Sequence, residues 1–300
     1  MDPRRPRDAF TRFRQAVRRC LPKRLDGPAV AQWNAYRRWR RHQRATVFLI
    51  SYPKAGRTWL RAMMGHALQH HFGLYHVPIT ELEQFHDERS EIPRIRVYHD
   101  DVRRLGVASD LSYDKRKYRG KSVVLLVRDP RDIVVSVFFH LKKRDLLVGT
   151  DLGDFLAQEC SGFGTVLEFH RIWRDNLHVP QRLLVVRYED LHDNAGRELR
   201  RVLDFAGLPA IADHEIAEAV RFGRFDNMQQ MEREGRFETY RLRTRTPGEL
   251  DSFKVRRGKV GGYVDYLTPA QARDLDERLS QAGLECFGYA GAADAESGPR

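Results

Sequence analysis

One stretch near residue 50 constrains the fold more strongly than any other part of the sequence. Residues 46–50 are apolar or β-branched, which predicts a buried strand. Residues 51–56 include Ser, Pro and Gly and predict a tight turn, and from residue 58 onward apolar side chains recur at helical spacing. A strand, a loop and a helix N-terminus in this order form a phosphate-binding geometry, because the first helical N–H groups lack internal partners and the helix dipole is positive there.

The loop is similar to the nucleotide-binding pattern G-x-x-x-x-G-K-[ST] but departs from it twice. Ser51 stands at the first Gly, and Arg57 stands at the Lys, followed by Thr58. Arg is too bulky to copy a Lys that threads between two phosphates. We therefore expect backbone N–H groups to hold a phosphorylated ligand, with Lys54 reaching the reacting group from the other side.

The length and composition indicate a globular protein. A chain of 300 residues is long enough for one large domain or two small ones. It contains no apolar run near the roughly 20 residues that cross a bilayer, and its charged N-terminus lacks the apolar segment of a secretory signal. The three cysteines, Cys20, Cys160 and Cys286, are far apart and odd in number, which indicates reduced thiols of a cytoplasmic protein and no zinc spacing.

The net charge of +12 is concentrated at the N-terminus. Residues 1–44 hold 14 Lys and Arg against three Asp, and we assign residues 1–45 to a basic extension. Helical spacing predicts an amphipathic helix over residues 8–21 and a second short helix carrying Trp33, Tyr36 and the basic run 37–44. Residues 8–44 could contact an anionic membrane or an acidic acceptor, or could pack on the domain with a solvated Arg face, as charge runs usually do. No motif for specific binding of nucleic acid accompanies the charge.

Three motifs carry a family resemblance. The 5′-phosphosulfate loop of sulfotransferases that use 3′-phosphoadenosine 5′-phosphosulfate (PAPS) usually reads T-Y-P-K-S-G-T-T-W, and residues 51–59 resemble it with Ser-Tyr-Pro-Lys-Ala-Gly-Arg-Thr-Trp. Residues 128–136 are similar to the family's 3′-phosphate motif R-x-x-x-D-x-x-x-S, in which Arg128 and Ser136 occupy the binding positions. Residues 256–263 are similar to R-K-G-x-x-G-x-W, with Arg257 in place of the Lys and Tyr263 in place of the Trp.

Further matches occur in the family's order along the chain. His99 ends a strand predicted over residues 92–98, where a K-T-H-like segment of the family places the catalytic base, although Val97 stands at the Lys. Tyr188 begins a Tyr-Glu-Asp sequence after a strand predicted over 182–187, and the family's Tyr touches the nucleotide. Residues 225–228 resemble a segment near the adenine, but Gly223 replaces its usual Thr.

The resemblance implies a single P-loop-like α/β domain over residues 46–288, with a mostly parallel central sheet, helices on both faces and a flexible tail over 289–300. The continuous apolar run 121–127 independently predicts a central parallel strand. That strand ends at Arg128, and ligands of such sheets bind at the carboxyl ends of the strands. Considered alone, Arg128 would also suit an ion pair with Asp132.

Local signals predict further helices. Residues 151–169 indicate one or two helices broken at Gly162 and Gly164. The sequence Thr-Pro-Ala-Gln at residues 268–271 predicts a capping box with Pro at the first helical position, and a helix from there to Gly283. Residues 74–94 are polar and show no clear period.

The resemblance also implies PAPS as the donor, PAP (the 3′,5′-bisphosphate of adenosine) as the product, and no metal. Trp59 would stack on the adenine ring. The residues that would bind the nucleotide are Lys54, Ala55, Gly56, Arg57, Thr58, Trp59, Arg128, Ser136, Tyr188, Arg256, Arg257 and Gly258.

The implied reaction transfers a sulfuryl group to a hydroxyl or amine acceptor. Lys54 would stabilise charge on the leaving phosphate, and His99 would take the acceptor's proton. Ser136 would touch Lys54 before the acceptor binds. Alternatively, His99 could cap its strand or bond to the backbone.

Rival bases and rival functions remain open at this point. The other candidate bases are His66 on the first helix and His76 and His86 in the polar segment 74–94. A nucleotide kinase would use a similar loop but requires Lys at residue 57 and carboxylates for Mg²⁺. A non-catalytic nucleotide- or membrane-binding protein would require only the loop and the basic extension. The acceptor could be a small molecule, a lipid or a carbohydrate, in a pocket shaped by residues 74–94 and 232–252.

Overall fold

The computed structural model describes residues 28–103, 105–142, 150–234 and 258–290. The chain divides into two units between Arg44 and Ala45. In the first unit the structure describes one helix, α2 (Pro28–Arg44), which is longer than the short helix predicted around the basic run. The helix predicted over 8–21 and residues 291–300 of the predicted tail lie outside the described residues.

The second unit is built on a four-stranded parallel sheet. The strands are β1 (Val47–Ser51), β2 (Ile95–Tyr98), β3 (Ser122–Val127) and β4 (Arg182–Arg187), in the order β2-β1-β3-β4. All three strand pairs are parallel, with Leu49 opposite Val97 of β2 and Val124 of β3. The predicted parallel α/β fold is therefore confirmed, and the apolar run 121–127 forms a central strand as expected.

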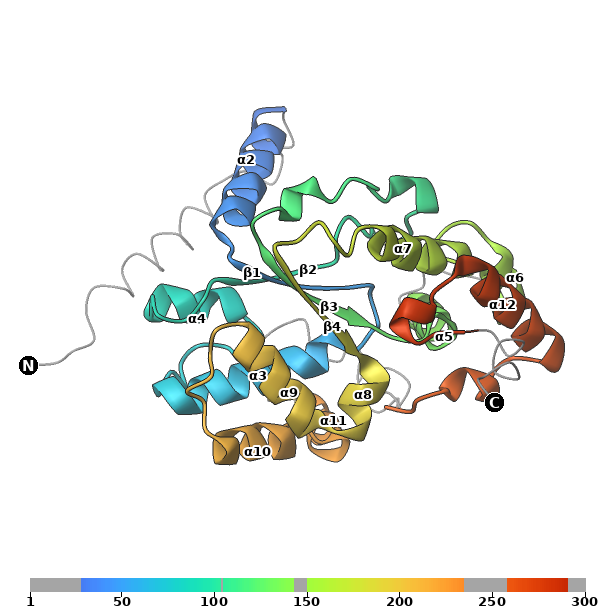
Figure 1. Ribbon diagram of the computed structural model, residues 1–300. Coiled ribbons are helices and arrows are strands. Elements are labelled where there is room, and N and C mark those ends of the chain that lie inside the picture. Colours follow the sequence, from blue (N-terminus) through green and yellow to red (C-terminus); the bar gives the residue numbers. More distant parts are fainter. Residues whose placement is uncertain (1–27, 104, 143–149, 235–257, 291–300) are drawn as a thin grey trace, which may run out of the picture. The chain divides into compact units, whose positions relative to one another are not determined.

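Alternating residues of the central strands serve two separate cores. Phe48, Ile50 and Leu125 belong to one core, while Leu49 and Val124 belong to the other. Helices α5 (Pro130–Lys142), α6 (Leu152–Ala157), α7 (Phe163–Asp175) and α12 (Pro269–Ala282) pack on the first face. Helices α3 (Arg57–Phe72), α4 (Leu82–Glu88), α9 (Ala195–Phe205) and α10 (Asp213–Phe222) pack on the second (Figure 1).

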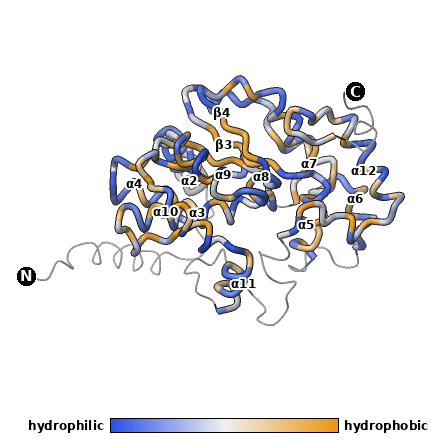
Figure 2. The backbone as a smooth tube through the Cα atoms, turned by 60° about the horizontal axis from the view of Figure 1, so that its bottom comes forward, coloured by the Kyte–Doolittle hydropathy of each residue, from blue (hydrophilic) through white to orange (hydrophobic). Residues whose placement is uncertain are grey.

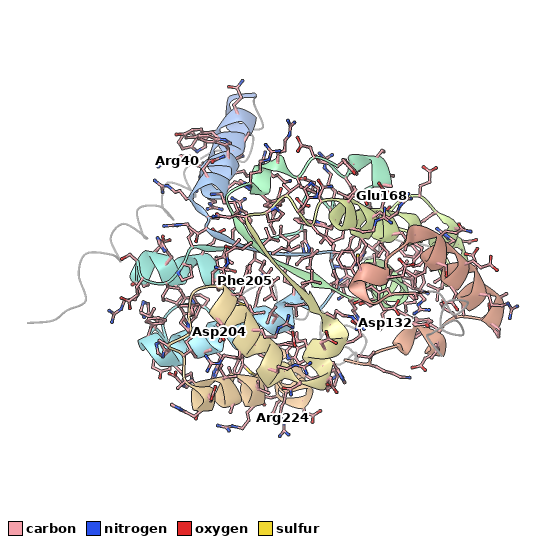
Figure 3. All side chains as sticks on the ribbon, in the orientation of Figure 1. Arg40, Asp132, Glu168, Asp204, Phe205 and Arg224 are labelled. Atoms are coloured by element: carbon pink, nitrogen blue, oxygen red, sulfur yellow. The ribbon has the colours of Figure 1, made fainter. Side chains whose placement is uncertain are left out.

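The hydropathy pattern follows this layering. Strands β3 and β4 are coloured as hydrophobic in the middle of the unit in Figure 2, with helices around them. At the β4 edge, Phe205 of α9, labelled in Figure 3, lies under the guanidinium of Arg182 at 4.5 Å from its ring centre. Two further helices, α8 (Tyr188–Asp193) and α11 (Phe225–Arg233), complete the described α-helices of this unit. Within the described ranges, no helix is both long enough and apolar enough to span a membrane.

Local signals account for several helix ends. The predicted capping box at Thr268 is present, with Pro269 as the first helical residue and Gly283 in the left-handed conformation at the C-terminus of α12. The predicted helix break at Gly162 is also present, since Gly162 caps α7 and a Cβ there would lie 2.1 Å from the carbonyl oxygen of Gln158. The second predicted break, at Gly164, is wrong because that residue lies inside α7.

One helix and one strand boundary differ from the prediction. Residues 74–94 showed no period, yet they contain α4, which has seven residues and buries Leu82 and Phe85. Two turns with two apolar contacts are too short to give a detectable period. The predicted strand over 92–98 begins only at Ile95, because Pro93 has no N–H to donate to a neighbouring strand.

Candidate active site

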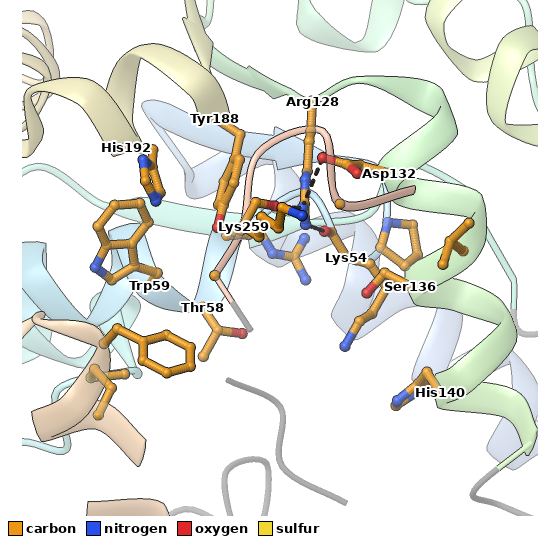
Figure 4. Close-up of a pocket in the computed structure, with 18 of the residues that line it drawn as sticks. Lys54, Thr58, Trp59, Arg128, Asp132, Ser136, His140, Tyr188, His192 and Lys259 are labelled. Carbon is orange, nitrogen blue, oxygen red and sulfur yellow. Dashed lines mark hydrogen bonds and ion pairs between the residues drawn. The ribbon is translucent and has the colours of Figure 1, made fainter. Parts of the chain in front are cut away.

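A cavity of about 550 Å³ lies where the four parallel strands end. Each strand is followed by residues that line it: Lys54 after β1, His99 after β2, Arg128 after β3 and Tyr188 after β4. Figure 4 draws Lys54, Arg128 and Tyr188 around the same opening. The carboxyl edge of a parallel sheet is the expected position for a ligand, so the predicted residues of four separate segments converge as the topology requires.

The loop after β1 presents a helix N-terminus to the cavity. Gly56 precedes α3 with φ 92°, contributes no side-chain cap, and is followed by a first turn without acidic residues. A Cβ on Gly56 would lie 2.5 Å from Cδ2 of Tyr188, so the close packing of this tyrosine also requires glycine. Lys54 has a positive φ of 74° as well, which is uncommon for a residue with a side chain. The uncapped N–H groups and the helix dipole favour an anion here.

Trp59 is held in a fixed orientation on the cavity wall. Its Nε1 donates a hydrogen bond to the carbonyl of Gly223 at 2.7 Å, and its ring meets Tyr188 edge-on with centroids 5.9 Å apart. A Cβ on Gly223 would lie 2.5 Å from Cγ of Met63, so a larger residue at position 223 would require Met63 to move. The glycine found in place of the expected Thr therefore fits the packing around the indole.

Arg128 is fixed on several sides. Its guanidinium donates to the carbonyls of Lys54 (3.3 Å) and Lys259 (3.0 Å), and it lies 4.2 Å above the ring centre of Tyr188. The alternative ion pair with Asp132 is also present, at 3.2 Å. Among the described residues, Nε of Arg128 is buried without a hydrogen-bond partner. A buried N–H donor of this kind fits a ligand that brings an anionic oxygen.

Asp132 joins the segment after residue 257 to helix α5. Its carboxylate accepts hydrogen bonds from the backbone N–H groups of Gly261 and Tyr263, both at 2.9 Å. We did not predict this function, although Asp132 stands four residues after Arg128 and four before Ser136, on one face of α5. Ser136 and His140 continue this face and line the cavity (Figure 4).

The segment that Asp132 holds includes part of the third predicted motif. Gly258 lines the cavity with φ 60°, and a Cβ there would lie 2.8 Å from Cδ2 of Phe225. The other two predicted residues of the motif, Arg256 and Arg257, lie outside the described residues. Ala55 is fully buried, and Thr58 lines the cavity beside Gly56.

His99 occupies one tautomer. Its Nδ1 lies 3.0 Å from the carbonyl oxygen of Ser51, and because a carbonyl only accepts, Nδ1 carries the hydrogen. Its Nε2 contacts Nη2 of Arg57, which only donates, so Nε2 carries the lone pair. The predicted alternative of a backbone bond is therefore present, and the second nitrogen, Nε2, is an acceptor that Arg57 occupies.

The turn after His99 is rigidly held. Asp100 is fully buried and lies 2.8 Å from the ammonium groups of both Lys115 and Lys117, and it accepts a hydrogen bond from Tyr118 at 2.6 Å. Burial alone would raise the pKa of Asp100, but the two ammonium groups lower it below its usual value. Asp100 is thus an anion that fixes the end of β2, and with it the position of His99.

The three rival histidines do not line the cavity. His66 stacks between His70 and Phe222, and burial lowers its pKa to about 4. His86 bonds through Nδ1 to the carbonyl of Ile92 at 2.6 Å, and His76 is exposed beside Glu88. The other histidines that line the cavity, His140 and His192, were not predicted.

The cavity carries a strong excess of positive charge. Among its described lining residues, Asp132 is the only acidic side chain and is engaged by Arg128 and the backbone. The cationic lining residues are Lys54, Arg57, Arg61, Arg128 and Lys259. Such a site favours a multiply charged anion. In the part of the chain that the structure describes, His, Cys, Asp and Glu form no group of three or more suited to a metal ion.

Comparison with known proteins gives a consistent result. The sulfotransferase domain family matches residues 44–284. Cytosolic sulfotransferase 12 of Arabidopsis thaliana is 24% identical over 268 residues, covering 78% of this chain and 76% of that protein. Human sulfotransferase 2A1 is 27% identical over 260 residues, covering 80% and 86% of the two chains.

Solved structures share the fold at low sequence identity. Mouse sulfotransferase SULT7A1 complexed with PAP superposes with a TM-score of 0.56 at 21% identity, covering 81% of this chain and 88% of that one. Retinol dehydratase in complex with androsterone and PAP gives a TM-score of 0.55 at 17% identity, covering 79% and 80%.

Proposed function

Since this chain belongs to the sulfotransferase domain family, we propose that it transfers a sulfuryl group from PAPS to a hydroxyl or amine acceptor, with Lys54 and His99 as catalytic residues. The convergence of Lys54, His99, Arg128 and Tyr188 at one sheet edge carries this proposal. The PAP in the solved complexes of SULT7A1 and retinol dehydratase, which share the fold, supports PAPS as the donor.

PAPS has anionic groups at two ends, and the cavity offers a cationic region for each. The uncapped start of α3 and Lys54 suit the 5′-phosphosulfate. Arg128, Ser136 and Gly258 suit the 3′-phosphate, with the buried Nε of Arg128 as one donor. The adenine would lie by Trp59, whose ring is held by the hydrogen bond to Gly223.

The proposed transfer is an in-line displacement at sulfur. The acceptor oxygen gives its proton to Nε2 of His99 and forms a bond to sulfur, while the bond from sulfur to the bridging oxygen breaks and its electron pair stays on the 5′-phosphate. The ammonium of Lys54 stabilises that charge, an effect worth about 3–4 kcal/mol for one preorganised donor. Ser136 would contact Lys54 before the acceptor binds.

Calorimetry and transfer assays test the donor and the two catalytic residues. PAP should bind at least tenfold more tightly than AMP, which lacks the 3′-phosphate. Lys54→Ala and His99→Gln proteins should still bind PAP but transfer sulfate about 10²–10³-fold more slowly. Equal affinity for PAP and AMP would contradict the proposed 3′-phosphate site. Full activity of either variant would contradict the catalytic role of the residue that it replaces.

The same assay separates the rival functions. A kinase would transfer phosphate from ATP and would stop when EDTA removes Mg²⁺. We expect sulfate transfer from PAPS to continue at an unchanged rate in EDTA. A protein that binds PAP and transfers sulfate to none of a broad set of acceptors would instead favour a non-catalytic nucleotide-binding function.

The acceptor is proposed to be a small hydroxylated molecule with an apolar body. Val135, Phe225, Met228 and Tyr266 line the cavity and give it an apolar portion. The complex of retinol dehydratase with androsterone provides a related example of such a ligand. Sulfate transfer from ³⁵S-labelled PAPS should be screened with steroids, phenols, lipids and carbohydrates. A preference for carbohydrates would contradict an apolar acceptor.

We also propose that helix α2 contacts an anionic membrane surface from the cytoplasmic side. Trp33 and Trp39 are 58% and 57% exposed, and Tyr36 between them is 46% exposed, with ring centroids 5.8 and 5.9 Å apart. The helix also carries five arginines and no acidic residue; Arg40 is labelled in Figure 3. Aromatic rings suit the lipid interface, and each nearby Arg contributes about 1 kcal/mol of attraction to anionic lipid.

Sedimentation with vesicles tests this contact. The full chain should bind vesicles of phosphatidylserine and phosphatidylcholine more tightly than vesicles of phosphatidylcholine alone, and salt should weaken the binding. Replacing Trp33 and Trp39 by Ala should weaken it further without changing PAP affinity. Equal binding by the double variant would exclude the aromatic contact.

A further inference from the structure

Two hydrogen bonds fix the state of His99, and one of them comes from the donor-binding loop. Arg57 is the first residue of α3, and its guanidinium contacts Nε2 of His99 across 42 positions of sequence. The carbonyl of Ser51 holds the opposite nitrogen at 3.0 Å. The nitrogen that the proposed mechanism needs for the acceptor's proton is therefore the one that Arg57 occupies.

This contact is incompatible with a protonated His99. A guanidinium only donates hydrogen bonds and keeps its charge at every accessible pH. A proton on Nε2 would place an N–H group against the N–H groups of Arg57 and a positive charge beside another. Proton transfer from an acceptor to Nε2 consequently requires Arg57 to move away first.

The bound donor offers Arg57 a stronger partner. Arg57 lines the cavity at the uncapped start of α3, where the 5′-phosphosulfate is proposed to bind. Hydrogen bonds between a guanidinium and an anionic oxygen are roughly twice as strong as those to a neutral acceptor. A phosphosulfate would therefore compete effectively with the neutral imidazole.

We propose that Arg57 is a positioning residue for His99, which occupies the Nε2 lone pair until the donor binds and then moves to the 5′-phosphosulfate. The inference rests on the proposed function, because it takes His99 as the base and the loop as the donor site. The contact with Arg57 prevents His99 from accepting a proton until the donor is in place. The usual family loop has a Thr at the position of Arg57, and a Thr side chain is too short to contact His99 in this way.

Several other charged groups lie near His99. In the following turn, Asp100 and Asp101 are engaged by Lys115 and Lys117. Lys54 shares the cavity wall with Arg57. Arg57 contacts the imidazole directly, through Nη2 at Nε2.

NMR of the histidine side chains tests the proposal on the full chain. The ¹⁵N signals of His99, assigned by comparison with His99→Gln, should show hydrogen on Nδ1 and a lone pair on Nε2 in the absence of nucleotide. Adding PAP should raise the titration midpoint of these signals by about one pH unit or more, as Arg57 leaves.

In Arg57→Thr the midpoint should be raised already, and PAP should then shift it little. Arg221→Thr, which removes an exposed arginine of α10, is the matched control and should behave as wild type.

The possible results are distinguishable. If PAP binds by calorimetry but the His99 signals of the wild type do not change, Arg57 does not move and the inference is wrong while the proposed function stands. This measurement uses only the wild-type protein, so it remains decisive even if Arg57→Thr folds poorly. If Arg57→Thr titrates as the wild type does, the contact does not control His99. If PAP does not bind at all, the proposed function itself is wrong.

Discussion

At the residue scale, the site depends on a few positions whose backbone and neighbours leave little freedom. Gly56 has a φ of 92° and lies directly against the ring of Tyr188. That ring in turn supports the guanidinium of Arg128 at 4.2 Å. One glycine thus sets the distance between the loop after β1 and the arginine after β3.

Replacing Gly56 by Ala, with a matched control, separates the effect of the backbone conformation from the effect of the contact with Tyr188. A positive φ makes Ala unfavourable by about 1 kcal/mol, and the new methyl group would also displace Tyr188. We expect Gly56→Ala to lose at least tenfold in PAP affinity by calorimetry. Gly207→Ala is the matched control, because Gly207 has a φ of 87° and open space around it. It should lose similar stability and keep its PAP affinity; a Gly56→Ala protein that binds PAP normally would contradict the packing argument.

At the scale of elements, helix α5 organises one side of the cavity. Asp132, Ser136 and His140 follow one another along its face, and Asp132 holds the segment 258–263 by two backbone hydrogen bonds. The helix therefore positions the hydroxyl of Ser136 and also the segment 258–263, which lines the same cavity.

An Asp132→Asn protein should loosen that segment. The Asn side chain has one acceptor oxygen where the carboxylate has two, so one of the N–H groups of Gly261 and Tyr263 loses its partner, at about 1–3 kcal/mol. We expect faster amide hydrogen exchange over 258–263 and a roughly tenfold loss of PAP affinity.

The control for this variant is Asp276→Asn. Asp276 pairs with Arg131 of α5 at 2.5 Å and does not line the cavity, so the same change of charge should leave PAP affinity within twofold. If both variants lost affinity equally, a general weakening of α5 would explain the result better than the loss of the two backbone bonds.

The elements that the sequence predicted well are those defined by local pattern. The apolar run 121–127, the loop at 51–56 and the capping box at Thr268 each contain their own signal within a few residues. The short helix α4 escaped prediction because two turns give no period. The wrong break at Gly164 shows that a glycine inside a helix does not end it when the packing on both sides continues.

Within the site, the sequence predicted which segments converge but not how their side chains pair. Contacts such as Arg57 with His99, or Asp132 with Gly261, join residues 42 and 129 positions apart. No pattern within a window of residues reports them. The motif spacing identified Arg128 and Ser136, whereas the function of Asp132 between them required the three-dimensional structure.

At the scale of the whole molecule, buried histidines couple stability to pH. His170 lies inside the first core on α7, where burial lowers its pKa to about 4, although the hydrogen bond to Val166 and the charge of Asp129 act in the opposite direction. The unfolded chain therefore binds a proton at His170 near pH 6.5, while the folded chain does not. Its contribution to stability is complete above pH 6.5 and is lost as the pH falls toward 4.

This linkage predicts the shape of the stability curve. The free energy of unfolding, from urea denaturation, should fall by up to about 3 kcal/mol on account of His170 between pH 6.5 and 4. His170→Asn, which keeps a donor for the Val166 carbonyl, should flatten that part of the curve. His214→Asn, at an exposed position, should leave the slope unchanged. An unaltered slope in His170→Asn would show that other groups govern the acid transition.

The contact between Gly56 and Tyr188 also limits how this protein could diverge. A Cβ at position 56 would overlap the aromatic ring of Tyr188, so neither residue can be substituted by a larger one without a change at the other. A descendant that acquired alanine in the loop would first need a smaller residue at 188, and it would then lose the surface on which Arg128 rests. The pair should be inherited together, with intermediates that lack nucleotide affinity.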